Sequence, residues 1–134
     1  MNKGNTKYLL DNFSFFGLCF GNKRVDPFTF QCEDGWFVLL KDLCEKLQGI
    51  DLKEVQVNCV KEKFGELRFY ILVGANEGKD KMKEAFRLVA EATDKSKKIC
   101  ERCGADNAGL KRKLKVNIAQ VKTLCEACAG SDFK

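Results

Sequence analysis

Four of the eight cysteines of this 134-residue chain lie in two Cys-x-x-Cys pairs near its end. The pairs are Cys100 with Cys103 and Cys125 with Cys128, and 21 residues separate the two inner cysteines. A two-residue gap lets a tight turn direct both sulfurs at one ion, and Gly104 can adopt the positive φ that such a turn often needs. Two matched pairs therefore predict one metal site with four thiolate ligands.

Zinc is the ion that this donor set favours, because four sulfurs complete a tetrahedral shell and leave no position for water or substrate. A closed site of this kind is structural. Two alternatives stay open: the same ligands can hold a rubredoxin-like iron centre, and one pair alone can act as a redox dithiol, although that leaves the second pair unexplained. We expect one structural Zn²⁺ on which the folding of residues 100–128 depends.

The other four cysteines have no such spacing, and three of them fall in phase with apolar neighbours. Free cysteine in such a pattern behaves as a small hydrophobic residue. We expect burial in the core, with a second metal site as the alternative, for Cys19, Cys32, Cys44 and Cys59.

The chain contains no histidine. This excludes Ser/His/Asp and Cys/His nucleophilic sites, hydrolysis at a His-ligated zinc ion and His phosphorelay. Among the remaining groups, Glu62 and Glu66 lack apolar neighbours that would raise the pKa of one carboxyl group. A nuclease is disfavoured because the sequence has no acidic metal cluster. The sequence therefore favours a non-catalytic protein.

The net charge of +5 is concentrated in the last third of the chain. Residues 95–134 carry ten basic and four acidic side chains, a net charge of +6. Four thiolates and one Zn²⁺ would leave this segment at about +4. Such a local excess favours polyanionic partners. The candidate phosphate contacts here are Lys95, Lys97, Lys98, Arg102, Lys111, Arg112, Lys113 and Lys115.

A second basic group surrounds a predicted hairpin turn. Lys61 and Lys63 precede the turn, and Arg68 and Tyr70 share one face of the strand that follows it. A guanidinium group and a phenol ring beside two lysines could bind a phosphate and stack a base. The residues alone favour a simpler interpretation, a solvated face whose lysines are neutralised by neighbouring glutamates.

The hydrophobic pattern predicts an α+β fold. Alternating apolar and polar residues predict a short strand at 28–32 and a β-hairpin with strands at 55–59 and 67–73. Helical spacing predicts helices at 35–48 and 79–98.

The ends and faces of these elements are also predicted. The first seven residues are polar and are expected to be mobile. Asp34 is the expected N-cap of the first helix and Gly49 its left-handed stop. A cluster of phenylalanines between residues 13 and 37 is expected in the core. The stripe of the second helix that faces the core is Met82, Ala85, Phe86, Val89 and Ala92.

Two structural parts follow from these elements. We expect residues 1–98 to form an α+β core, a β-hairpin or small antiparallel sheet with two helices. Between the cysteine pairs, strands at 110–116 and 121–124 are expected to form a small ribbon. We therefore expect residues 99–134 to be a zinc-ribbon module, packed on the core as one structural unit.

The length and composition place the chain among globular proteins. A chain of 134 residues can bury a core without disulfides, and 45% hydrophobic with 32% charged residues excludes a disordered protein. No apolar run reaches the roughly 18 residues of a membrane span, and residues 8–20 lack the features of a signal peptide. We expect no membrane contact and a cytoplasmic location, in which thiols stay reduced.

Three segments stand out together: 35–37 (GWF), 61–70 (KEKFGELRFY), and the ribbon with 99–104 (ICERCG) and 122–125 (KTLC). Over about residues 30–128 the chain resembles a widespread, largely uncharacterised group of small proteins encoded by bacteriophages and prophages. Its relatives often have Gly at the position of Glu66. The glutamate makes the turn of this chain less permissive than theirs. They often have His in place of Cys128, which keeps a zinc ligand. The resemblance implies a phage accessory role, in the host cytoplasm, with no established activity.

We expect the protein to act by binding. The first hypothesis is an accessory protein whose basic C-terminal third makes salt-dependent contacts with nucleic acid. The alternative is an anti-defence protein that sequesters a nucleotide immune signal or blocks a host protein by direct contact. The sequence leaves the partner and the oligomeric state open, although a sequestering protein would build its pocket between subunits of a homo-oligomer.

Overall fold

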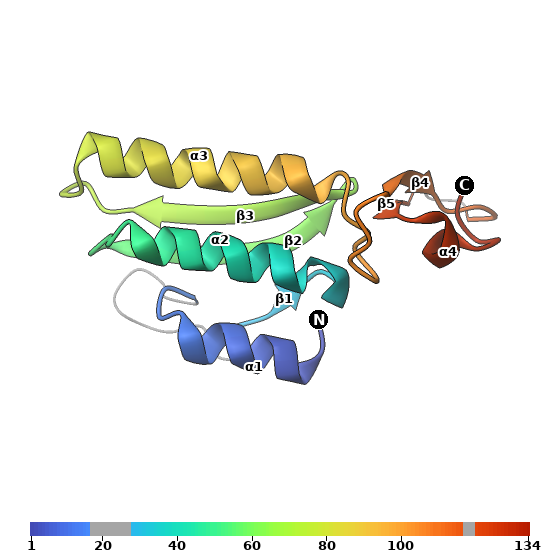
Figure 1. The fold of residues 1–134 in the computed structure, drawn as a ribbon, viewed down its shortest axis with the longest axis horizontal. Coiled ribbons are helices and arrows are strands. Elements are labelled where there is room, and N and C mark those ends of the chain that lie inside the picture. Colours follow the sequence, from blue (N-terminus) through green and yellow to red (C-terminus); the bar gives the residue numbers. More distant parts are fainter. Residues whose placement is uncertain (17–27, 117–119) are drawn as a thin grey trace.

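The computed structural model describes residues 1–16, 28–116 and 120–134. In Figure 1, β4, β5 and α4 lie at one end of a body formed by the other elements. The α+β class predicted from the sequence is confirmed. In chain order the elements are α1 (Lys3–Asn12), β1 (Phe30–Gln31), the 3₁₀ helix η1 (Asp34–Trp36), α2 (Phe37–Gly49), β2 (Val55–Lys63), β3 (Glu66–Val73), α3 (Lys79–Ser96), β4 (Gly109–Arg112), β5 (Val121–Leu124) and α4 (Glu126–Ala129).

The larger sheet has the strand order β1-β2-β3. The predicted hairpin is present: β2 and β3 are antiparallel, with register pairs from Val55↔Val73 to Lys63↔Glu66. β1 is added parallel to β2, with Phe30 beside Val60. A parallel neighbour needs a crossover connection, and the segment containing α2 supplies it.

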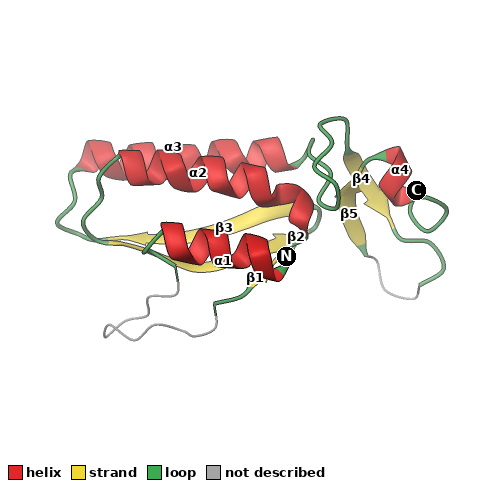
Figure 2. Ribbon diagram, turned by 60° about the horizontal axis from the view of Figure 1, so that its bottom comes forward, coloured by secondary structure: helices red, strands yellow, loops and turns green. Residues whose placement is uncertain are grey.

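The two faces of this sheet differ sharply. Figure 2 shows α2 and α3 side by side over one face. Residues Leu67, Phe69 and Ile71 of β3 are buried on that side, whereas the intervening Tyr70 and Leu72 are 49% and 39% exposed. The alternation follows from the two-residue period of a strand. The helices therefore cover one face, and the other keeps an exposed aromatic side chain.

A phenylalanine cluster fills the core next to the sheet, as the sequence predicted. The ring of Phe16 lies 5.0 Å from that of Phe30, 5.3 Å from that of Phe28 and 6.3 Å from that of Phe69, between centroids. Trp36 is fully buried, and its Nε1 donates a hydrogen bond to the carbonyl of Ile99. Aromatic burial of this extent is a large part of the stability of such a core.

The first residues form a helix, contrary to the prediction that they are mobile. The side chain of Asn2 accepts a hydrogen bond from the N–H of Asn5 at 2.7 Å and so caps α1, and Leu9 is completely buried. Asp34 is not a helix cap. Its carboxylate accepts a hydrogen bond from the N–H of Asn2, which lowers the pKa of Asp34, and another from the side chain of Asn5.

Three further details differ from the sequence prediction. Gly49 lies inside α2, and the left-handed residue after it is Asp51, with φ of 59°. α3 ends at Ser96. Phe86, predicted to face the core, is 48% exposed, while Leu88 is buried in phase with Ala85 and Ala92. One residue turns a helix by about 100°, so neighbours in sequence face different surroundings.

Candidate metal centre

The two cysteine pairs come together beside the small sheet of β4 and β5. Cys100 and Cys103 lie in the turn after α3, Cys125 follows β5 directly, and Cys128 lies in α4. The four sulfur atoms all lie within 4.8 Å of one another, and the Sγ atoms of Cys103 and Cys125 are 3.6 Å apart. A tetrahedral ion with sulfur at about 2.3 Å requires sulfurs about 3.8 Å apart. The four side chains are therefore positioned to hold a metal ion.

Each pair is shaped by a tight turn. Gly104 has φ of +85°, and its N–H donates to the carbonyl of Cys100 at 2.8 Å. In the second pair the N–H of Ala129 donates to the carbonyl of Cys125 at 2.9 Å, and Gly130 has φ of +54°. The positive φ predicted for Gly104 is present, and residues with a Cβ rarely adopt this backbone conformation.

The electrostatics of the four sulfurs favour a bound cation. Burial opposes ionisation of Cys100, but N–H groups of Cys125, Cys103 and Arg102 donate to its sulfur and bring its pKa down to about 7. Burial and the adjacent sulfurs raise the pKa of Cys128 to about 12. One thiolate thus forms readily, and further thiolates beside it require a positive charge among them.

A charge network around one buried carboxylate joins the cysteine ribbon to the core. Glu101 lies between the first two cysteines and is 1% exposed. Its carboxylate accepts hydrogen bonds from Lys122 Nζ at 3.0 Å and from the N–H of Glu33 at 3.1 Å. Burial raises the pKa of Glu101, and Lys122 opposes that shift. Removing Lys122 would leave the buried carboxylate of Glu101 without its compensating charge.

Two glycines allow the close approach of the two parts. The N–H of Gly35 donates to the carbonyl of Glu101 at 2.7 Å, and a Cβ on Gly35 would lie 2.1 Å from the carbonyl oxygen of Cys100. At the hairpin tip the carbonyl of Gly65 accepts a hydrogen bond from the buried hydroxyl of Thr123 at 2.6 Å. This junction was missed in the sequence, although the charge of Glu101 inside a cysteine pair was a visible signal for it.

The basic residues of the last third fall into two sets. Lys97 pairs with Glu66 and Asp94, Arg102 donates to the carbonyl of Cys128, and Lys111 pairs with Glu126. Lys95 pairs with Glu91. No ion pair with a described residue is formed by Lys98, Arg112, Lys113 or Lys115.

The second predicted group lies on the sheet face that the helices leave uncovered. Lys61 is paired in register with Arg68, and Cys59 with Tyr70. Residues opposite one another in an antiparallel pair share a face. The register therefore brings the four predicted residues, Lys61, Lys63, Arg68 and Tyr70, together on one face of the hairpin.

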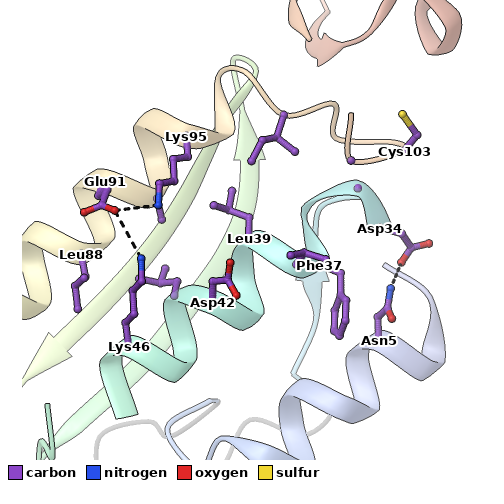
Figure 3. Close-up of a pocket in the computed structure, with 16 residues that line it drawn as sticks. Asn5, Asp34, Phe37, Leu39, Asp42, Lys46, Leu88, Glu91, Lys95 and Cys103 are labelled. Carbon is purple, nitrogen blue, oxygen red and sulfur yellow. Dashed lines mark hydrogen bonds and ion pairs between the residues drawn. The ribbon is translucent and has the colours of Figure 1, made fainter. Parts of the chain in front are cut away.

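A groove of about 380 Å³ lies between α2 and α3 and ends near Cys103 (Figure 3). Leu39 and Leu88 are among its apolar lining residues. Glu91 of α3 contacts Lys46 of α2 at 3.7 Å and Lys95 of its own helix at 2.9 Å. The groove is lined by three carboxylates, those of Asp34, Asp42 and Glu91, and by two lysines that already have a carboxylate partner. It therefore offers little attraction for a phosphate.

The cysteines outside the metal centre were predicted to lie in the core. Cys32 and Cys44 are buried and Cys59 is half-buried, and all seven cysteines of the described residues are free. Burial raises the pKa of Cys32 to about 12, so its thiol stays protonated. The prediction for Cys19 lies outside the described residues.

Comparisons of the chain with protein-family models, curated proteins and solved structures give no match. Within residues 1–16, 28–116 and 120–134, no helix has the length and hydropathy to cross a bilayer.

Proposed function

We propose that the protein is a non-catalytic phage accessory protein that binds nucleic acid, and that one structural Zn²⁺ organises its ribbon. Zinc is supported by a donor set of four sulfurs that all lie within 4.8 Å of one another. With all four positions taken by protein, the ion has no place for water or substrate, which is why its role is structural. The phage origin rests on the three sequence segments that resemble phage proteins.

The observation that carries the binding proposal is the group of unpaired cations at the edge of the ribbon. Arg112 exchanges two backbone hydrogen bonds with Lys134, each 3.0 Å long, and Lys113 forms a bridge with Phe133. Residues 112–114 and 132–134 thus lie side by side in the ribbon. The cations of these segments are Arg112, Lys113 and Lys134, and Lys115 directly follows the first segment. Asp132 is the acidic side chain of the same segments. Cations that form no ion pair within the described part of the protein are free to bind phosphates.

The alternative of a sequestered nucleotide signal is less well supported. Its phosphates would need a basic pocket, whereas the groove between α2 and α3 carries more carboxylates than amines, and Glu91 neutralises Lys46 and Lys95. A linear polyanion on a surface fits the distribution of charge better than a small anion in this groove.

A binding titration at two salt concentrations tests the proposal. We expect labelled oligonucleotides to bind with an affinity that falls steeply as salt rises. The triple variant Arg112→Gln, Lys113→Gln, Lys115→Gln should lower both the affinity and the salt slope, by about one unit of slope per lost contact. The matched control changes three exposed lysines without ion pairs among the described residues, Lys3, Lys79 and Lys83, to Gln.

The control keeps the same net charge as the variant, so the comparison isolates position from total charge. Equal weakening by the two triple variants, or an affinity that does not respond to salt, would contradict the proposal.

A further inference from the structure

The uncovered face of the β2–β3 hairpin combines charge with exposed aromatic rings. Along β3, Arg68, Tyr70 and Leu72 point away from the buried Leu67, Phe69 and Ile71. On β2, Lys61 and Lys63 lie on the same side, because they are paired with Arg68 and Glu66. We define this group, Lys61, Lys63, Arg68, Tyr70 and the turn residue Phe64, as the hairpin face.

The charge of the hairpin face is not neutralised as the simpler interpretation of the sequence required. Glu62 is paired in register with the buried Leu67, so it points to the opposite side of the strand. There it lines a hollow beside β5, whose edge at the hairpin tip is shared by Lys63 and Phe64. Glu66 remains, and it is shared by Arg68 and Lys97 at 3.5 Å each. Among the described residues, Lys61 and Lys63 have no carboxylate partner. The three cations of this face therefore share a single carboxylate among the described residues, that of Glu66. Glu66 also pairs with Lys97, which lies outside the hairpin.

Two polar atoms on the same face lack a hydrogen-bond partner in the described part of the chain. They are Nε of Arg68 and Oε1 of Gln56, and both are buried atoms. Gln56 is paired in register with Leu72, two residues beyond Tyr70. Buried polar atoms normally have partners, because leaving one unpaired costs roughly 1–3 kcal/mol. The Arg68 side chain as a whole is 35% exposed, so its guanidinium group can turn toward a phosphate on this face and gain partners there.

The turn presents an aromatic side chain where the backbone disfavours one. Phe64 has φ of +55° and is 67% exposed, and Gly65 follows with φ of +79°. Positive φ at two central turn residues is typical of Asn-Gly, and a bulky residue there is a genuine outlier. Lys63 Nζ lies 5.6 Å from the centroid of the Phe64 ring. An exposed ring kept in a strained turn points to a contact outside the molecule.

The separation of the two rings indicates the kind of ligand. Tyr70 lies six residues after Phe64, so the hairpin face extends about 20 Å along the strands. That length equals several stacked nucleotides at about 3.4 Å each. Aromatic rings interspersed with cations are how proteins bind single strands, since every base can stack on a ring and the backbone is followed by positive charge.

We infer that the hairpin face binds single-stranded nucleic acid, with bases stacked on Tyr70 and Phe64 and phosphates held by Lys61, Lys63 and Arg68. This inference rests on the proposed function. It specifies that the bound nucleic acid is single-stranded and adds a second binding surface to the ribbon. The ribbon cations then extend the path of the strand or bind independently of it.

The test uses the full-length protein, an oligonucleotide of about 12 nucleotides and the duplex of the same sequence. Tyr70→Thr keeps a residue suited to a strand and removes the ring, and it should weaken single-strand binding at least about fivefold. Tyr70→Phe keeps the ring and should retain the affinity. Phe86→Ala removes a ring of similar exposure from α3 and serves as the control.

A second variant separates binding from folding. Phe64→Asn places the residue that the turn prefers, so it should raise the thermal midpoint while it weakens single-strand binding. Loss of affinity in a more stable protein cannot come from misfolding. The inference is overturned if Tyr70→Thr and Phe64→Asn bind like the wild type while the ribbon triple variant still loses affinity. If the wild type binds no oligonucleotide at all, the proposed function falls as well.

Discussion

The core and the ribbon of this protein are built in different ways. Among the described residues, the core contains a continuous cluster of 21 buried hydrophobic residues, with phenylalanine rings packed between the sheet and the helices. The corresponding cluster in the described part of the ribbon has five members, of which two are the cysteines Cys100 and Cys125. Apolar burial alone can order the first part, whereas the second has too little of it to offset its conformational entropy.

This difference explains why the ribbon needs two additional supports. One is the four-sulfur site, where the proposed structural Zn²⁺ would supply free energy on the order of 10 kcal/mol. The other is the junction with the core, where Lys122 and Glu33 form a charge network with the buried Glu101 and Gly35 permits contact between backbones. The ribbon therefore depends on the core, and we expect the core to depend much less on the ribbon.

Loss of the metal should separate the two parts most strongly. Cys100→Ser, or chelation of the ion, should unfold residues 100–128 and remove about 10 kcal/mol of stabilisation from them, while the core stays folded. Hydrogen exchange followed by peptide analysis measures both parts in one sample. Cys59→Ser changes a half-buried cysteine outside the site and is the matched control. Equal loss of protection in α2 and in β5 would contradict the asymmetry.

A smaller effect is expected from the junction. Gly35→Ala places a Cβ against the carbonyl of Cys100, so the backbones must move apart, at a cost of about 1–3 kcal/mol. We expect metal affinity to change little and protection of β5 to fall. Gly49→Ala, where a Cβ meets no atom within 4 Å, is the control. If Gly35→Ala lowered metal affinity as much as a cysteine variant, site and junction would not be separate supports.

The smallest effect concerns the cap of α1. Asn2→Ala removes the side chain that accepts from Asn5 and should lower the free energy of unfolding of the core by about 1 kcal/mol. Urea unfolding followed by Trp36 fluorescence reports it, because Trp36 is buried in the core. Asn2→Asp can still cap the helix and should retain most of the stability. An Asn2→Ala protein as stable as the wild type would show that α1 is held by Leu9 alone.

Local patterns predicted much of the structure. Alternation in β2 and β3 and the spacing of the cysteine pairs each depend on residues close in the sequence, and both the hairpin and the gathering of four sulfurs are present. The α1 helix was missed because its stability comes from a cap at Asn2 and from burial of Leu9, while most of its other residues are polar. Phe86 was assigned to the core because hydrophobicity does not say which way a helix faces.

The junction could not be predicted from sequence because its members are far apart in the chain. Glu33 and Lys122 are separated by 89 residues, and the strand pattern places Lys122 among residues expected at the surface. Likewise, only the register of β2 against β3 shows that Glu62 does not share a face with Lys61 and Lys63. The sequence pattern identified Lys61, Lys63, Arg68 and Tyr70 as candidates, but which carboxylates share their face is visible only in the register.

X-ray absorption spectroscopy of the protein as isolated tests the central claim most directly. The account predicts one zinc ion per chain, surrounded by four sulfur atoms at about 2.3 Å and by no oxygen or nitrogen. An iron edge, a shell that includes a water oxygen, or protein that carries no metal while its ribbon stays folded would contradict it.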